Sequence, residues 1–186
     1  MYLGLDLGTS SVKALIVDAS GTAVASQSVP LQVIRRKAGW SEQDPQSWWD
    51  ATNRAVRSLG AEYPEEMRKI TGIGLSGQMH GLTALDANDT VLRPAILWND
   101  TRSASQAMQL DTGHPAFRQL GGNAVMPGFT APKAVWMAEN EPELFQRLGT
   151  VLLPKDYLRL RMTGEKVSDM SDAAGTLWLD VARRDW

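Results

Sequence analysis

Three short apolar segments follow one another in the first thirty residues, and no other feature of the sequence constrains the fold as strongly. Residues 2–7, 12–17 and 22–29 have the length and aliphatic content of strands, and the polar segments with glycine between them are typical of turns. Turns this short join antiparallel strands. Because residues 12–17 are apolar at nearly every position, we expect layers of helices above and below the sheet.

The rest of the sequence predicts a mixture of helices and strands. An acid followed by a proline, Asp44 and Pro45, predicts the start of a helix that ends at Gly60. Further strands are expected at 70–75, 82–85, 95–98 and 151–153, and further helices at 103–110, 115–120, 130–138, 142–148 and 156–162. This order of elements predicts an α/β fold with a mixed, partly antiparallel sheet and helices on both of its faces.

The composition excludes several classes of protein. The chain has 186 residues, of which 43% are hydrophobic, enough for one well-filled core. A net charge of -2 excludes the basic field that a nucleic-acid partner needs, and the absence of Cys, with only two His, excludes thiolate chemistry and Cys or His-rich metal centres. The N-terminus lacks a basic signal region, and no apolar stretch approaches the roughly 20 residues that span a bilayer. We therefore expect a cytoplasmic protein without membrane or nucleic-acid partners.

The clearest chemical signal lies at the end of the first predicted strand, in the sequence Asp6-Leu7-Gly8-Thr9-Ser10-Ser11, with Lys13 just beyond it. The glycine lets the backbone approach an anion closely, three successive hydroxyls can bind phosphate oxygens, and the acid can hold Mg²⁺ through water. A polar hairpin that merely needs a glycine is the alternative. The position of Asp6 favours the functional interpretation, because an acid that ends an apolar strand costs folding energy unless a cation meets it.

Two more polar groups follow predicted strands. Gln78, Met79 and His80 lie between two glycines after the strand at 70–75, at a sheet end where small polar ligands usually bind. A single histidine in a loop, satisfied by its own contacts, is the alternative. Asp100 and Arg102 follow the strand at 95–98, where they contact a ligand or pair with each other; we expect them mainly to support the site.

Two familiar motifs match the sequence, but the residues around them do not support the sites that these motifs usually indicate. Residues 72–77 match the glycine spacing of a dinucleotide site, but such a site needs a helix directly afterwards, and the sequence continues as a turn and a strand. Residues 111–113 spell the triplet of aspartic proteases, yet they follow a predicted helix, so a glycine that ends the helix is the better interpretation. No Walker A pattern occurs, and any use of ATP would not involve a P-loop.

Six segments, in the same order along essentially the whole chain, resemble the FGGY carbohydrate kinases, and within that family the bacterial kinases of xylulose. They are Asp6-Leu7-Gly8-Thr9-Ser10-Ser11, Trp40-Ser41-Glu42-Gln43-Asp44-Pro45, Gly77-Gln78-Met79-His80-Gly81, Leu97-Trp98-Asn99-Asp100, Met126-Pro127-Gly128-Phe129-Thr130-Ala131-Pro132-Lys133 and Leu153-Pro154-Lys155-Asp156-Tyr157-Leu158. One such segment would say little, but six in order are specific.

The resemblance implies an actin-like ATPase fold of the ribonuclease H type, in which the first of two domains supplies much of the sugar site and ATP lies between the two. Residues 1–186 would form that first domain. The implied reaction transfers the γ-phosphoryl group of ATP, with Mg²⁺, to the 5-hydroxyl of D-xylulose. A homodimer is expected for the full-length enzyme.

The resemblance also implies roles for individual residues. Asp6 is expected to be catalytic, as the acid that organises Mg²⁺ and the phosphates. The ATP phosphates are assigned to Thr9, Ser10, Ser11 and Lys13. The ketose is assigned to Met79 and His80, with Gln78 beside them. In glycerol-specific relatives the positions of Met79, His80 and Gly128 carry larger groups, so the residues found here favour a roomier pocket and a pentulose.

One departure from the family concerns the general base. The base of these kinases is an aspartate in a glycine-rich motif well downstream, and the sequence ends at Trp186 before reaching it. From this we expect a truncated chain that is inactive alone. Three alternatives remain. The first is a kinase of another pentulose or a polyol, and the second is a free-standing sugar-binding domain without catalysis. The third is a dinucleotide-dependent enzyme with a helix near Gly77.

Overall fold

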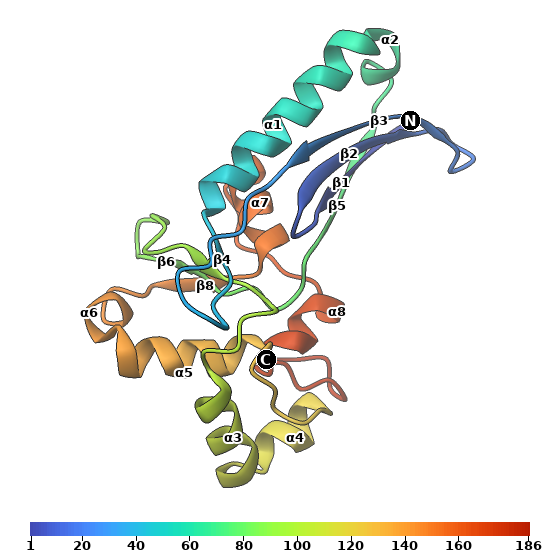
Figure 1. Cartoon of the computed structure of the whole chain (residues 1–186). Coiled ribbons are helices and arrows are strands. Elements are labelled where there is room, and N and C mark those ends of the chain that lie inside the picture. The colour runs from blue at the N-terminus through green and yellow to red at the C-terminus, as the bar shows by residue number, and fades with distance from the viewer.

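A four-stranded mixed sheet forms the N-terminal part of the computed structural model, which describes all of residues 1–186 (Figure 1). β1 (Tyr2–Leu7), β2 (Ser11–Val17) and β3 (Ala23–Pro30) pair as consecutive antiparallel strands. β5 (Gly72–Gly77) pairs with the free edge of β1 in parallel, which gives the order β3-β2-β1-β5. The three antiparallel strands and the mixed sheet expected from the sequence are confirmed.

The long helix α1 (Pro45–Glu62) begins where the sequence predicts and ends two residues after Gly60. The Asp44 side chain caps it by accepting a hydrogen bond of 3.0 Å from the backbone N–H of Gln46, and proline occupies the first helical position. Trp48, Ala51, Ala55 and Leu59, at helical spacing, are fully buried against the sheet. A short helix, α2 (Pro64–Met67), then returns the chain to β5.

The helices cover only one face of this sheet. α1 packs on β2 and β3, and α7 (Pro154–Thr163) packs beside β5 on the same side, where Leu7 and Val12 share a core cluster with both helices. Along β2 the burial alternates, so that Val12, Ala14 and Ile16 are buried while Lys13 is exposed. Within these 186 residues this corrects the expectation of helices on both faces, because the polar residues Ser11 and Lys13 interrupt the apolar run of β2 on its second face.

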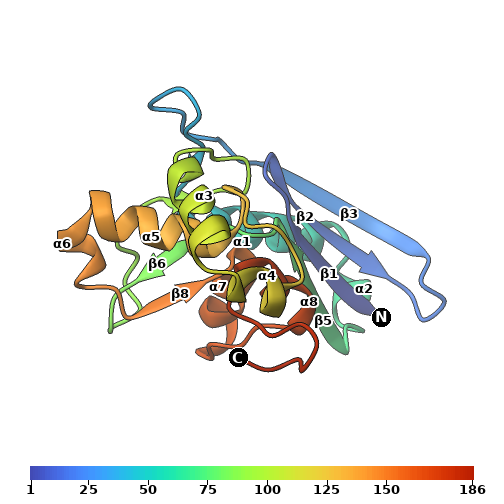
Figure 2. The ribbon, with the colours of Figure 1, turned by 90° about the horizontal axis from the view of Figure 1, so that it is seen from below.

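A second part of the chain is built from short strand pairs and helices around the end of β5 (Figure 2). β4 (Glu42–Gln43) pairs with β7 (Ala95–Ile96), and β6 (Thr83–Leu85) pairs with β8 (Thr150–Leu152). The helices are α3 (Ala104–Gly113), α4 (Ala116–Gly121), α5 (Thr130–Asn140), α6 (Pro142–Phe145) and α8 (Met170–Ala173), followed by a 3₁₀ turn at Ala174–Thr176. Only β4, α2, α8 and the 3₁₀ turn were not expected from the sequence.

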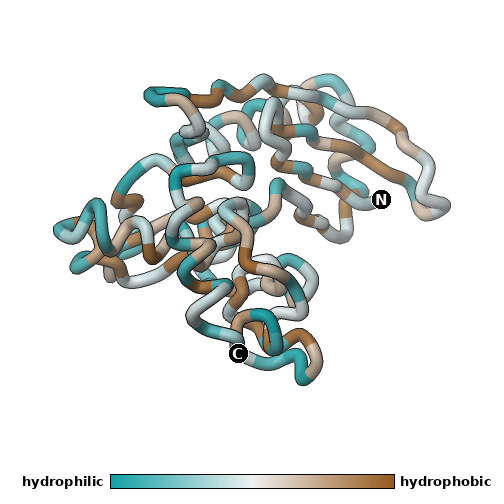
Figure 3. Tube along the Cα trace, turned by 60° about the horizontal axis from the view of Figure 1, so that its bottom comes forward, coloured by the Kyte–Doolittle hydropathy of each residue, from teal (hydrophilic) through white to brown (hydrophobic).

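The distribution of hydrophobic residues agrees with this division. They recur along the strands of the four-stranded sheet (Figure 3), where those on the covered face form the core with α1 and α7. A further cluster joins β6 and β7 to α5 through Ala84, Ile96, Trp136 and Met137. None of the helices has the length and apolar character needed to cross a membrane.

Two alternatives from the sequence are decided by the fold. Gly72–Gly77 is a strand throughout and is followed by a turn, not by a helix, so the dinucleotide hypothesis is wrong. Gly113 is the last residue of α3, and the nearby Asp111 is bound to Arg118, which confirms that residues 111–113 end a helix.

Candidate functional site

The turn between β1 and β2 and the turn after β5 lie side by side at one end of the sheet. β1 and β5 are parallel and in register, with Leu7 opposite Gly77. The backbone N–H of Gln78 donates to the carbonyl of Leu7 at 2.7 Å, which joins the start of the second turn to the end of β1. Small ligands bind at the carboxyl ends of parallel strands in many α/β proteins. The structure therefore brings together the two groups of residues that the sequence singled out.

Asp6 lies on the uncovered face of the sheet. In the strand register it stands between Lys13 of β2 and Ser76 of β5, and all three side chains are exposed. Its carboxylate makes no hydrogen bond or ion pair within the chain. The expectation that an acid at this strand end costs folding energy unless a cation meets it is therefore wrong, since alternation along β1 directs Asp6 to the open face. The carboxylate is instead free to bind a ligand.

The hairpin turn beside Asp6 is closed by a hydrogen bond of 3.0 Å from the Gly8 N–H to the Ser11 carbonyl. A Cβ on Gly8 would lie 3.2 Å from that carbonyl oxygen, a contact tight enough that the turn would have to shift slightly to accept a side chain. The hydroxyls of Ser10 and Ser11 have no hydrogen-bond partner in the protein. Like the exposed ammonium group of Lys13, they remain available to an anion.

Thr9 differs from its neighbours, because its hydroxyl both donates and accepts a hydrogen bond within the protein. It donates to Gln78 Oε1 at 3.0 Å and accepts from Trp98 Nε1 at 3.0 Å. The Thr9 carbonyl accepts a hydrogen bond of 2.7 Å from Gln43 Nε2. The Thr9 side chain thus links the first turn to the second, and sequence reasoning had expected it to face phosphate.

Gln43 is a site residue that the sequence analysis did not identify. It is fully buried on β4, and its Oε1 accepts hydrogen bonds of 2.9 Å from both Gln78 Nε2 and Trp48 Nε1. Together with its bond to Thr9 this fixes the Gln78 amide from one side. A glutamine before a helix cap carries no sequence signal of such a role, because its two partners in the site, Thr9 and Gln78, lie 34 and 35 residues away.

His80 adopts a left-handed backbone conformation, with φ of 62°. Its ring packs edge-on against Phe129, with 4.7 Å between centroids, and Nδ1 lies 3.2 Å from the carbonyl oxygen of Gly175. Because a carbonyl only accepts, Nδ1 carries the proton and donates. Burial, and then the charge of Lys133, lower the pKa of His80, which favours the neutral ring. Nε2 is then an acceptor, with no partner in the protein.

Two glycines make room for this arrangement. A Cβ on Gly175 would lie 2.1 Å from His80 Nδ1, and a Cβ on Gly128 would lie 2.7 Å from the Trp98 carbonyl oxygen. Met79 and Trp98 keep 46% and 42% of their surface exposed next to the turn. These two large side chains are therefore accessible to a ligand at the sheet end.

Two buried lysines, which sequence reasoning missed, support the second turn from α5 and α7. Lys133 Nζ donates to the carbonyls of His80 and Gly128 at 2.8 and 2.7 Å, and burial lowers its pKa to about 7. Lys155 pairs with Asp156, Asp169 and Asp172 at 2.8 to 2.9 Å. Burial opposes its charge, but the three carboxylates raise its pKa. Lys155 thereby holds α8 against the end of β5.

Asp100 and Arg102 pair with each other, which is one of the two interpretations left open by the sequence. The Arg102 guanidinium donates two hydrogen bonds of 2.9 and 2.7 Å to the Asp100 carboxylate and lies 3.6 Å from the Trp40 ring centroid. Arg102 also donates to Glu42 at 2.8 Å. Both members of the pair are buried, so they brace the loop that carries Trp98.

The residues present fit a magnesium ion held through water rather than directly. No three His, Cys, Asp or Glu side chains come together in a group that could bind a metal ion. Asp6 supplies one unpaired carboxylate beside free hydroxyls. Mg²⁺ usually keeps several waters and takes one or two carboxylates together with phosphate oxygens of a substrate. This donor set is compatible with such a hydrated ion.

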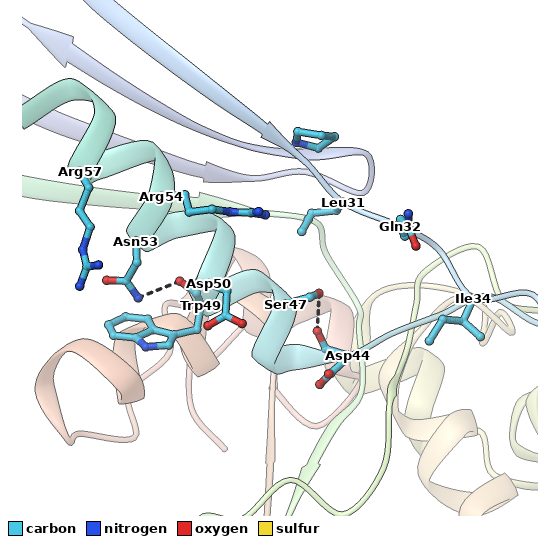
Figure 4. Close-up of a pocket in the computed structure, with 11 residues that line it drawn as sticks. Leu31, Gln32, Ile34, Asp44, Ser47, Trp49, Asp50, Asn53, Arg54 and Arg57 are labelled. Carbon is cyan, nitrogen blue, oxygen red and sulfur yellow. Dashed lines mark hydrogen bonds between the residues drawn. The ribbon is translucent and has the colours of Figure 1, made fainter. Parts of the chain in front are cut away.

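A wide groove lies away from these residues. It has a volume of about 980 Å³ and runs between α1 and the segment after β3, lined by residues such as Trp49, Asp50 and Arg54 (Figure 4). None of the site residues lines it. A smaller hollow of about 430 Å³ adjoins the site at the end of β5, between Ser76 and Lys155.

Comparison with known proteins places this chain in one family. Residues 1–186 match the model of the FGGY family of carbohydrate kinases, N-terminal domain. The chain is 55% identical to the xylulose kinase of Escherichia coli (strain K12) and 56% identical to that of Klebsiella pneumoniae; each alignment covers 100% of the chain and 38% of the relative. A "xyloylose kinase" from Brucella ovis superposes with a TM-score of 0.98 at 60% identity, covering 100% of this chain and 38% of that one.

These matches have two consequences. The chain spans 38% of the length of its curated relatives. The structural neighbours are sugar kinases with the actin-like ATPase fold, which confirms the fold expected from the sequence. On the match over its whole length, this chain belongs to the FGGY family of carbohydrate kinases and corresponds to the N-terminal domain of that family.

Proposed function

We propose that the protein acts as an ATP-dependent D-xylulose kinase, in which residues 1–186 form the sugar-binding domain. The observation that carries the proposal is the Thr9–Gln78 hydrogen bond, which joins a turn with free hydroxyls to a turn with free ligand groups. Phosphoryl transfer depends mainly on positioning and on stabilising charge. Two turns held in contact supply the positioning, and the identities to xylulose kinases support the substrate.

The two turns have different parts in the proposed reaction. Asp6, Ser10, Ser11 and Lys13 face the triphosphate of ATP. Met79 and His80 hold the ketose, and His80 Nε2 accepts a hydrogen bond from a sugar hydroxyl. A Mg²⁺ ion bound with the nucleotide would neutralise phosphate charge close to Asp6. Asp100, Arg102 and Gln78 hold these groups in place through the contacts described above.

The chemistry is a single displacement at phosphorus. The 5-hydroxyl oxygen of D-xylulose forms a bond to the γ-phosphorus while the bond from that phosphorus to the bridging oxygen of ADP breaks. The hydroxyl proton passes to a general base. We assign the base to no residue of this chain, and propose that it and most of the nucleotide pocket belong to a second domain, as the 38% coverage of the relatives allows.

The test compares the 186-residue chain with the product of the complete reading frame that encodes it. We expect the complete product to phosphorylate D-xylulose with Mg-ATP, and the chain alone to bind D-xylulose in calorimetry without turnover. Phosphorylation of D-ribulose or glycerol but not of D-xylulose would contradict the substrate. Sugar binding by a complete product that lacks any kinase activity would instead support a non-catalytic sugar-binding protein.

Two further points belong to this proposal. We place the reaction in the cytoplasm, where ATP is available. We also propose that the complete protein is a homodimer, which light scattering during gel filtration would test.

A further inference from the structure

The His80 carbonyl receives an unusual amount of support from one helix. Thr130 Oγ1 donates to it at 3.1 Å and Lys133 Nζ donates at 2.8 Å, both from the first turn of α5. Both side chains are completely buried. A carbonyl oxygen has two lone pairs, so these two donors satisfy it fully.

This support acts on a strained residue. A side chain with a Cβ is disfavoured in the left-handed conformation that His80 adopts, and such residues persist where the surroundings determine them. The two hydrogen bonds from α5 fix the direction of the His80 carbonyl. They thereby fix the orientation of the peptide unit that joins His80 to Gly81. Phe129, directly before the helix, packs on the ring of the same residue. One helix end therefore sets both the backbone and the ring of His80.

The choice of a lysine here is informative, because stability alone does not favour it. Lys133 forms no ion pair, and its Nζ donates only to the carbonyls of His80 and Gly128. Burying an ammonium group without a carboxylate partner is unfavourable, and an apolar side chain of similar size often serves a core as well or better. Through its second bond Lys133 also ties the loop at Gly128, which contacts Trp98, to the His80 turn.

We propose that Thr130 and Lys133 are positioning residues for sugar binding, which hold Met79 and His80 in the left-handed turn that presents them to the sugar. This rests on the proposed function, because it concerns the sugar subsite of the same reaction. Neither residue is expected to touch the sugar or ATP. Their loss should therefore change the affinity for sugar far more than the affinity for nucleotide.

The test uses the product of the complete reading frame and three variants of the turn support. Thr130→Val removes the hydroxyl at constant shape, and Thr130→Ser retains it. Lys133→Met removes the ammonium group and with it the hydrogen bonds to the carbonyls of His80 and Gly128. We expect Thr130→Val and Lys133→Met to raise the KM for D-xylulose about tenfold while the KM for ATP changes less than twofold. Thr130→Ser should stay close to the wild type.

Thr52→Val is the matched control. Thr52 Oγ1 is buried on α1 and donates to the Trp48 carbonyl at 2.8 Å, so its loss removes a comparable bond away from the turn. It should lower the melting temperature as Thr130→Val does, without a change in KM. The proposal is overturned if Thr130→Val and Lys133→Met leave the KM for D-xylulose unchanged, or if both KM values shift equally.

A second readout separates this proposal from the proposed function. The chain has only two histidines, His80 and His114, so the imidazole nitrogen resonances of His80 are readily assigned in NMR spectra. If the turn support is correct, Thr130→Val and Lys133→Met shift the His80 Nδ1 and Nε2 resonances, and Thr52→Val does not. If the resonances shift in a protein that phosphorylates no pentulose, the positioning role of Thr130 and Lys133 stands and the proposed kinase function is refuted. If the resonances do not shift, the positioning role is refuted.

Discussion

The two turns of the site are built in opposite ways. Around the first turn, Asp6, Ser10, Ser11 and Lys13 have no protein partners and lie on or beside an open sheet face. In the second turn, His80 is held through its ring, its Nδ1 and its carbonyl by residues 49 to 95 positions away in the sequence. Free groups suit an anion that arrives with its own cation, whereas a fixed geometry suits a sugar that must be distinguished from similar polyols. The comparison predicts that changes to the first turn affect rate, and changes to the second affect both stability and sugar affinity.

The largest expected effect is that of Asp6→Ala. Because Asp6 is exposed and unpaired, we expect its loss to leave the melting temperature of the chain unchanged. In the product of the complete reading frame we expect kcat to fall roughly 10³-fold, as when a group that stabilises transferring charge is removed. Steady-state kinetics and thermal unfolding measure the two quantities. If Asp6→Ala instead lowered the stability strongly and left kcat normal, the proposed difference between the two turns would be contradicted.

The second-largest expected effect is a dependence of the free energy of unfolding on pH, which is caused by Lys133. Its pKa is lowered from 10.5 to about 7 in the folded protein, so between pH 7 and 10.5 the unfolded chain binds a proton that the folded chain does not. The resulting penalty is fully present below pH 7 and disappears as the pH rises towards 10.5. We expect the unfolding free energy of the wild type, relative to Lys133→Met, to increase by a few kcal/mol over that range in urea titrations.

Lys155 provides the matched contrast for this measurement. Its pKa is raised by three carboxylates, so its stabilising contribution is present below its ordinary pKa and is lost as the pH rises above it. The unfolding free energy relative to Lys155→Met should therefore fall at high pH. If the unfolding free energy changed with pH in the same direction for both lysines, the environments assigned to them would be contradicted.

A smaller effect is expected from Gly175→Ala. The new Cβ would lie 2.1 Å from His80 Nδ1, so the ring must move out of its place against Phe129. We expect a loss of roughly 2 kcal/mol in stability and a clear rise in the KM for D-xylulose. Gly113→Ala is the control, because nothing lies within 4 Å of its Cβ position. Normal sugar affinity in the Gly175 variant would show that the position of the ring does not matter.

The smallest effect tests the link between the two turns. Thr9→Val removes the hydroxyl that joins Gln78 to Trp98, and Thr9→Ser keeps it. Because a hydrogen bond within a protein contributes about 1 kcal/mol net, we expect the valine variant to raise the KM for D-xylulose about fivefold, with the serine variant close to the wild type. A rise confined to the KM for ATP would assign the hydroxyl to the phosphates instead.

Local pattern was sufficient for most of the fold. The hairpin strands, the start of α1 at Asp44 and the glycine that ends α7 follow from neighbours in the sequence, and each was placed within a few residues. The two-residue strand β4 and the short helix α8 were missed, because elements of two to four residues depend on tertiary partners more than on propensity. Helices on both faces were also wrongly expected, since an apolar run alone does not reveal how far its second face is covered.

The sequence by itself determined the class of fold, the family and the residues that gather at one end of the sheet. A strand that ends in Asp6 and a turn with glycine are properties of adjacent residues, so they can be read without a structure. Only the tertiary structure decided that Asp6 is exposed, that Thr9 faces Gln78, and that Lys133 holds His80. Each of these depends on contacts between residues distant in the chain, and their geometry is set by how the sheet, β4 and α5 pack together rather than by any local pattern.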